Sequence, residues 1–369
     1  MNFEILGKNI KRLRSASKLS QKSLAVAAGI SLPSVKLIES GKASPRMSTI
    51  TAIATALNAA LQDLFVPVRE LHTVRFRSNR KMQNRESILA TVARWLDDFN
   101  SLEEITGERV PFKLKNLGRR KSSGDIIKMA ECCREALGLR STEPIRDICG
   151  LLESAGIKVF PIQMGSDGFW GLSIGEEDNG PAVVVNSWER ISTERKIFSA
   201  AHELAHLILH KDAFDVTRQE ESEDEERQAS LFASHFLMPN ESFRKEWDEA
   251  FGLHPIDRVL KVKRIFHVSY KTILVRLIEN GKANNSIFSE FQYRYFQRFN
   301  KKLAFKEEPQ AESIEPAGLQ KWDFYEDRLS RLTRKALDNN KISLARGAEI
   351  LGISIDEMQD LLKNWEAVL

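Results

Sequence analysis

Apolar residues recur every three to four positions along most of this chain, a pattern typical of helices that bury one face. Between residues 6 and 65 the pattern is divided into short helices at Gly29 and Gly41, since glycine readily ends a helix. Three serines in this stretch are candidate N-caps: Ser31, Ser44 and Ser48. The chain therefore begins with a small helical domain.

The middle of the chain mixes helical periods with short β-branched or alternating runs. Helices are predicted over residues 85–105, 126–137, 144–155 and 193–210. Another helix is predicted to begin in the acidic stretch 220–226 and to end at 237, and two more are predicted within residues 256–281. Strands are predicted over 157–161, 169–175 and 181–186, with 66–77 as a strand or extended linker. The expected fold class is mainly α with one small α+β domain and a helical C-terminal tail.

These patterns divide the chain into five parts. We expect a helical domain over 1–66, a strand and helix connector over 67–125, an α+β domain over 126–285, a linker region over 286–325 and a helical tail over 326–369. Within the linker region, residues 306–312 are polar and contain a proline. The second helix of the tail is acidic and would repel phosphate, so the tail is expected to bind a partner or to dimerise.

Charge changes this picture mainly at the N-terminus. The whole chain has a net charge of only +4, but residues 1–65 hold nine Lys or Arg against three Asp or Glu. The three cysteines are too few for a disulfide framework or a cysteine zinc site. Without a long apolar run or a signal-peptide pattern, we expect a cytoplasmic protein that does not enter the membrane.

One segment carries a metal-binding pattern, His-Glu-x-x-His at positions 202–206. On a helix, His202 and His206 lie one turn apart on the same face, where two imidazoles can hold one Zn²⁺. Glu203 lies beside them as a candidate general base. The neighbouring apolar residues have helical spacing, so we expect the segment to pack against a core: Ile197, Ala200, Leu204, Leu207 and Ile208.

A catalytic zinc ion also needs a third protein ligand. The candidate is Glu226, at the head of a helix face of small residues that includes Ala229, Ser230 and Ala233. Glu225 is the nearest competitor, and Glu220, Glu221, Glu223 and Asp224 are expected to form a solvated acidic loop that caps the helix. His210 lies too far along the helix to share an ion with His202, which favours a structural or supporting role.

The segment 195–210, followed by Glu226-x-x-Ala-x-x-Phe-Ala and Leu-Met-Pro at 237–239, closely resembles the ImmA/IrrE family of bacterial metallopeptidases. The likeness covers about residues 126–285 and implies a zincin-like α+β fold. It also implies His202, His206 and Glu226 as zinc ligands, with Glu203 as the base of a gluzincin-like endopeptidase. Trp170 and Asn186 are possible cleft-lining residues.

Residues 7–65 resemble the Cro/C1-type (XRE) helix-turn-helix domain, which implies five helices and binding to double-stranded DNA. By this resemblance Gln21 starts the second helix and is placed to touch phosphate, while Ser31 and Ser34 lie at the start of the recognition helix. Val35 and Ile38 are expected to pack inward. The residues left for the DNA groove are then Leu32, Pro33, Lys36 and Leu37.

Two functions follow from these resemblances. The first is a homodimeric DNA-binding regulator whose zinc endopeptidase domain cleaves a repressor, a toxin or itself. The second is a non-proteolytic antitoxin and autorepressor of a toxin–antitoxin pair, in which the zinc fold serves only to bind the toxin. The intact Glu203 favours the first, because a binding module has no use for a general base.

Overall fold

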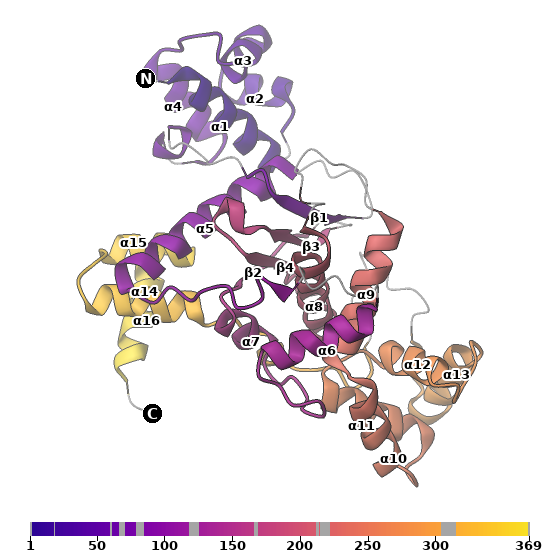
Figure 1. Cartoon of the computed structure of the whole chain (residues 1–369). Coiled ribbons are helices and arrows are strands. Elements are labelled where there is room, and N and C mark those ends of the chain that lie inside the picture. The colour runs from indigo at the N-terminus through magenta and orange to yellow at the C-terminus, as the bar shows by residue number, and fades with distance from the viewer. Residues whose placement is uncertain are drawn as a thin grey trace. The chain divides into compact units, whose positions relative to one another are not determined.

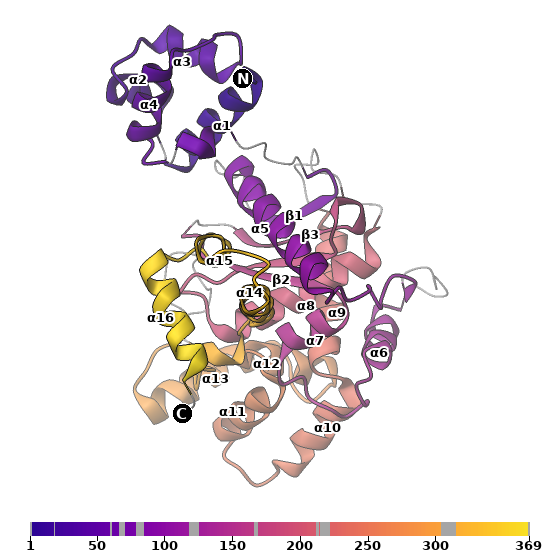
Figure 2. The same ribbon diagram turned by 90° about the vertical axis from the view of Figure 1, so that its left-hand side faces the viewer.

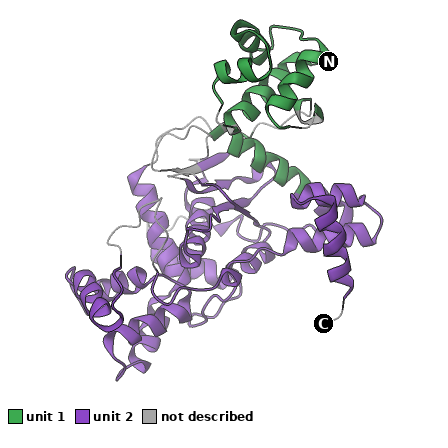
Figure 3. Ribbon diagram, turned by 180° about the vertical axis from the view of Figure 1, so that it is seen from behind, with its two compact units in different colours: residues 1–71, 81–98 green, residues 72–80, 99–369 purple. Residues whose placement is uncertain are grey.

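The computed structural model of this chain describes residues 2–17, 19–59, 61–65, 71–78, 85–117, 125–165, 169–211, 214, 222–303 and 315–367. The chain divides into two compact units, one of residues 1–71 and 81–98 and one of residues 72–80 and 99–369 (Figure 3). Among the described residues no helix is long and apolar enough to cross a membrane.

The first unit begins with four short helices and a single 3₁₀ turn over Leu61–Leu64, which takes the place of a fifth helix. The helices are α1 (Phe3–Ala16), α2 (Gln21–Ala27), α3 (Leu32–Glu39) and α4 (Met47–Ala56). Gly29 and Gly41 follow α2 and α3 with φ of 65° and 69°, and Ser31 caps α3, as predicted. Ser44 and Ser48 are not caps, because Arg46 stays extended and α4 starts after it.

Close packing of α1 on α3 brings the first unit's core together. A Cβ atom at Gly7 would lie 2.3 Å from the carbonyl oxygen of Ile38, so only glycine allows these helices to approach so closely. Beside this contact the buried carboxylate of Glu39 accepts hydrogen bonds from Arg14, at 2.5 and 3.1 Å, and from Gln21, at 2.7 Å. Glu39 thereby links three helices.

The second unit is built around a four-stranded sheet in the order β1-β3-β4-β2. The strands are β1 (Val74–Ser78), β3 (Phe169–Ile174), β4 (Ala182–Asn186) and β2 (Lys158–Ile162). β3 runs antiparallel to both β1 and β4, and β2 runs parallel to β4. The three predicted strands are confirmed, and β1 falls in the segment expected to be extended, of which residues 66–70 lie outside the described part.

Two layers of helix support one face of this sheet. Helix α8 (Thr193–Leu209) packs on β3 and β4, and α9 (Glu223–Leu237) packs between α8 and α6 (Ile126–Ala136), as Figure 1 shows. Helix α7 (Ile148–Ser154) is shorter than predicted, because the Asp147 side chain accepts from the amide of Gly150 and starts the helix there.

The segment expected to be a linker contains a helix that packs into the core. Helices α10 (Asn240–Glu249), α11 (Pro255–Phe266), α12 (Tyr270–Glu279) and α13 (Ile287–Phe299) form a helical group at one end of the second unit. In α13, Phe291 and Tyr295 are buried, and the Phe291 ring stacks on Tyr270 at 5.0 Å. Its aromatic residues are core residues, so residues 287–299 belong to the folded domain; residues 306–312 lie outside the described part.

The opposite side of the sheet holds a buried charge cluster that ties down the predicted helical tail. Glu103, on the part of α5 (Arg85–Thr106) that belongs to the second unit, lies 3.2 Å from Lys158 of β2 and 2.7 Å from Arg328. Arg328 begins α14 (Arg328–Asp338), which is followed by α15 (Leu344–Leu351) and α16 (Ile355–Glu366) (Figure 2). The helix, glycine turn, helix pattern predicted for the tail is confirmed, with Gly352 at φ 67°.

Candidate metal centre

Helix α8 brings the two histidines and the glutamate of the motif into the interior of the second unit. Ser192 caps the helix by accepting from the amide of Arg195, and the predicted apolar stripe is buried against the sheet and α9. His202, Glu203 and His206 are themselves fully buried. Burial of three polar side chains is costly unless each has a partner, so their surroundings decide what this site can do.

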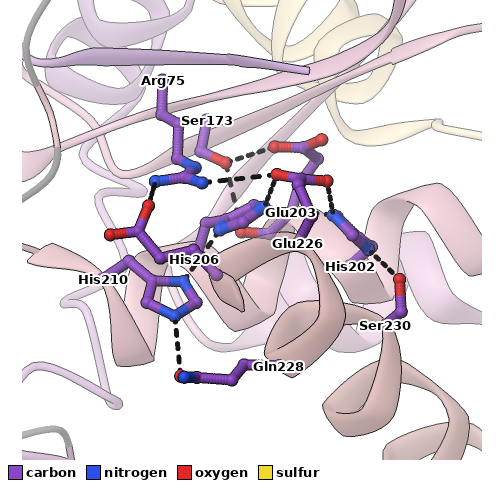
Figure 4. A network of polar contacts seen from close by, with 10 residues as sticks. Arg75, Ser173, His202, Glu203, His206, His210, Glu226, Gln228 and Ser230 are labelled. Carbon is purple, nitrogen blue, oxygen red and sulfur yellow. Dashed lines mark hydrogen bonds and ion pairs between the residues drawn. The ribbon is translucent and has the colours of Figure 1, made fainter. Parts of the chain in front are cut away.

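The three predicted ligands meet at one point (Figure 4). His202 Nε2 lies 3.0 Å from His206 Nε2, and the two oxygens of Glu226 lie 3.0 Å from His202 Nε2 and 3.1 Å from His206 Nε2. Ligand atoms at ~2.0–2.1 Å from a tetrahedral zinc ion are separated by about 3.3–3.4 Å. The three residues therefore fit a small divalent cation with only a slight outward movement, and they form the one group of this kind among the described residues.

The second nitrogen of each histidine has its own partner. His202 Nδ1 lies 3.3 Å from the hydroxyl of Ser230, and His206 Nδ1 lies 2.9 Å from His210 Nδ1. His210 Nε2 in turn lies 3.2 Å from the amide oxygen of Gln228, which accepts a hydrogen bond from it. A bound metal would replace the Nε2 protons that hydrogen-bond to Glu226, and these partners would let both ligand histidines keep a proton on Nδ1. His210 thus has the supporting role that the sequence favoured.

Electrostatics keep two of the three ligands, His206 and Glu226, in the form that a metal requires. Burial lowers the pKa of His206 to about 4, so its imidazole is neutral near pH 7. Burial alone would raise the pKa of Glu226, but hydrogen bonds with His202 and His206 outweigh it and hold that pKa well below its usual range. Neutral imidazoles and an ionised carboxylate are the states in which these residues bind metal.

Glu203 is held in place from the sheet. Its Oε2 accepts a hydrogen bond of 2.5 Å from the hydroxyl of Ser173 on β3. A Cβ atom at Gly171, on the same strand, would lie 2.9 Å from Glu203 Oε1, so only glycine leaves room for the carboxylate here. These two contacts were not predicted, because neither serine nor glycine has a sequence signal that relates it to a residue thirty positions away.

Arg75 is a third residue of the site that the sequence did not indicate. It lies on β1 and donates to Glu225, at 2.5 Å, and to Glu226, at 3.3 Å. Its side chain is only 6% exposed. Glu225, the competing ligand candidate, is therefore engaged by Arg75, while Glu226 points at the histidines. Of the four acidic residues expected to cap α9, Glu223 and Asp224 lie in its first turn. The other two, Glu220 and Glu221, lie outside the described residues.

A groove of about 680 Å³ borders the His202 side of the centre. Ser230, which contacts His202, lines it, as does Phe198, whose ring lies 6.4 Å from that of His202. Trp170 also lines the groove, with Arg195 over its ring at 4.4 Å, so it borders the site as suggested. Asn186 does not line this groove: it is buried, and its amide nitrogen donates to the carbonyls of Met164 and Phe169.

The first unit presents the other candidate interface. In α3, Val35 and Ile38 are buried as predicted, and Pro33, Lys36 and Leu37 are exposed. Leu32 is partly buried against the core. Ser31 and Ser34 bond to each other across the first turn, and the Gln21 amide donates to Glu39. Among the exposed residues of α3, Lys36 is the one that carries a positive charge.

Comparison with known protein families matches two parts of the chain. Residues 5–65 match the model of a helix-turn-helix domain, and residues 152–278 match that of the IrrE N-terminal-like domain, a peptidase family. The chain joins a helix-turn-helix domain to an IrrE N-terminal-like domain. This confirms the two resemblances and their order, and makes the protein a regulator with a peptidase-like domain. Strand β1, which carries Arg75, precedes the matched IrrE-like region.

Three solved structures align with almost the whole of the chain, at low identity and low TM-score. PlcR of Bacillus thuringiensis, in complex with the peptide PapR7 and DNA, is 12% identical, with 98% of this chain and 96% of that chain covered and a TM-score of 0.19. ComR from S. thermophilus is 12% identical, with 98% and 95% covered and a TM-score of 0.16. ComR from Streptococcus suis is 11% identical, with 99% and 96% covered and a TM-score of 0.17. No curated protein matches the chain significantly.

Proposed function

We propose that this protein is a zinc-dependent endopeptidase that cleaves a regulatory protein and that is attached to its own DNA-binding domain. The observation that carries the proposal is the buried Glu203, held by Ser173 beside the convergent atoms of His202, His206 and Glu226. A site that only bound metal for stability would be completed by its ligands, with no need of a further buried carboxylate beside them.

The residues of the chain divide the work of peptide hydrolysis. His202, His206 and Glu226 would hold the ion, and Glu203 would take the proton of the attacking water and pass it to the leaving amine. Bound zinc would supply Lewis acidity, which polarises the scissile carbonyl and favours ionisation of a water. Ser173 fixes the carboxylate of Glu203 for this proton transfer by donating its hydroxyl proton to Oε2.

The lining of the groove suits an extended protein segment that carries a bulky apolar side chain. Four apolar side chains line it: Trp170, Phe198, Leu231 and Val275. Five residues with hydroxyl groups also line it: Ser192, Ser230, Ser234, Ser269 and Thr272. A volume of about 680 Å³ is suited to a few residues of peptide.

The test of the peptidase is Glu203→Gln in the full chain, which keeps the size of the side chain but removes the base. We expect zinc to bind with unchanged stoichiometry while cleavage falls at least ~10³-fold. The measurement is a comparison of protein N-termini in cells that express the wild type or the variant, with exposed Glu189→Gln as the control. If the variant generates the same N-termini and regulates normally, proteolysis is excluded and the non-proteolytic antitoxin remains.

We also propose that the protein binds double-stranded DNA as a homodimer, with α3 as the helix that contacts the DNA. Lys36→Ala should weaken binding of the full chain to the DNA upstream of its gene by about tenfold and lower the salt slope by about one. Lys363→Ala in the tail, also strongly exposed, is the matched control. Equal binding by wild type and Lys36→Ala at every salt concentration would remove Lys36 from the interface.

A further inference from the structure

The strand β1 contributes to the metal centre although it precedes the matched IrrE-like region. In the register of the sheet Arg75 pairs with Ser173, and residues paired across antiparallel strands project to the same face. That face is the one covered by α8 and α9, so Arg75 and Ser173 reach the same site: Ser173 bonds to Glu203 and Arg75 to Glu226 (Figure 4).

The beginning of β1 is fixed independently of the metal centre. The Asp178 carboxylate accepts from the amides of His72 and Thr73 and from the Thr73 hydroxyl, at 2.6, 2.5 and 2.9 Å. The amide of Gly175 also donates to the carbonyl of Thr73. Arg75, two residues further on, therefore enters the site from an anchored backbone.

Arg75 faces two adjacent carboxylates, only one of which reaches the histidines. Its Nη1 donates to Glu225 and its Nη2 to Glu226, so the two arms of the guanidinium bind different acids. Neighbouring helix residues point about 100° apart, and two carboxylates this close would repel each other and compete for one cation. The positive charge between them removes the repulsion and holds Glu225 away from the histidines.

We propose that Arg75 is a positioning residue that assigns Glu226, rather than Glu225, as the third metal ligand. Its bond to Glu226 Oε1 orients that carboxylate, and its bond to Glu225 occupies the competitor. The pair formed with Glu225 also offsets the charge of Arg75, so that the guanidinium does not repel a bound cation. This inference rests on the metal site of the proposed function and adds to it a residue from the connector strand.

The test measures zinc affinity of the full chain by competition with a chromogenic chelator, together with the absorption spectrum of the Co²⁺-loaded protein. We expect Arg75→Gln to weaken zinc binding by about 10–100-fold and to alter the Co²⁺ spectrum. Arg75→Lys should give an intermediate loss, because an ammonium group cannot bind both acids as a fork does. Arg140→Gln, 85% exposed, should match the wild type.

A second variant separates positioning from a general loss of structure. If Glu225 competes once Arg75 is removed, then Arg75→Gln combined with Glu225→Gln should bind zinc more tightly than Arg75→Gln alone. Wild-type zinc affinity and an unchanged Co²⁺ spectrum in Arg75→Gln would overturn the inference, as would a lowered Tm of the metal-free protein with unchanged affinity. A wild-type chain that binds no zinc would instead overturn the metal site itself.

Discussion

The two units each hold a carboxylate where three structural elements meet, but the groups around the two carboxylates differ. Glu39 of the first unit is surrounded by donors: Arg14 from α1 binds both of its oxygens and Gln21 from α2 binds one. Glu226 of the second unit faces two histidines and one arm of Arg75. In both clusters the polar atoms lie within hydrogen-bond distance of one another, so short distances alone do not distinguish a structural cluster from a functional one.

The difference lies in the number of acceptor atoms. The oxygens of Glu39 meet N–H groups that cannot give up their protons near pH 7, so the cluster is complete in itself. At Glu226, two imidazole nitrogens and two carboxylate oxygens converge, and the other nitrogen of each histidine has a partner of its own. Such an excess of acceptors favours a cation. Removing members of each cluster in turn should therefore affect metal binding in the second unit and stability in the first.

The largest effect is expected from a ligand of the second cluster. His206→Gln should weaken zinc binding by at least ~10³-fold, because two protein ligands hold zinc far less well than three. Zinc content after dialysis and chelator competition measure the loss, with exposed His72→Gln as the control. Retention of one tightly bound zinc per chain in His206→Gln would show that the three residues do not form the metal site.

The matching change in the first cluster should leave zinc binding untouched and destabilise the fold. Glu39→Ala leaves Arg14 mostly buried without its carboxylate, which we expect to lower the free energy of unfolding of the first unit by about 3 kcal/mol. Amide hydrogen exchange over residues 2–59 measures this, and exposed Glu4→Ala is the control. Equal exchange in Glu39→Ala and the wild type would show that the cluster does not hold α1, α2 and α3 together.

Much of this organisation could be predicted from local pattern. His202, Glu203 and His206 share one helical turn, so helix geometry was enough to bring these three together. Glu226 lies on another helix, and its face of small residues and the family resemblance pointed to it. The three strands around residues 158–186 were evident from their β-branched residues. Val35 and Ile38 likewise followed from helical periodicity.

The missed features depend on contacts between distant parts of the chain. Arg75 meets Glu226 only because β1 pairs with β3 in one particular register, and a single strand gives no sign of its register. Helix α13 was taken for linker because its exposed Tyr293 and its buried Phe291 and Tyr295 make a polar and aromatic sequence without a clean apolar stripe. Gln21 bonds to Glu39 eighteen residues away, which the sequence alone did not indicate.

One methyl group added beside Glu203 should separate the role of the general base from that of the metal ligands. In Gly171→Ala the new Cβ would press on Glu203 Oε1 and on the carbonyl of Val184, each at 2.9 Å. We expect cleavage to fall about 10²-fold, since a displacement of this size at the reacting group is costly, while zinc affinity changes much less. Gly165→Ala, where the nearest atom is 3.8 Å away, is the matched control. Equal losses of zinc binding and cleavage would mean that the strand supports the ligands, not the base.

The smallest effect is expected in the pH dependence of stability, and it comes from His235, which lies outside both clusters. Burial lowers the pKa of His235 to about 4, with Arg276 adding to the effect and Asp125 opposing it, and Glu279 lies 3.8 Å from its ring. Because the folded-state pKa lies below the unfolded value of about 6.5, the unfolded chain binds the proton first, and stability is lost as the pH falls through this interval. We expect the free energy of unfolding to drop by about 1–2 kcal/mol between pH 7 and pH 5 on account of this residue.

His235→Gln removes the titrating group, so urea unfolding of the variant should show a weaker loss of stability between pH 7 and pH 5 than the wild type. The exposed His254→Gln is the control for histidine replacement in the same unit. His206, His210 and the half-buried His267 also have lowered pKa values and remain in both variants, so part of the acid sensitivity persists. An identical pH dependence in His235→Gln and the wild type would show that His235 is protonated as readily in the folded protein as in the unfolded chain.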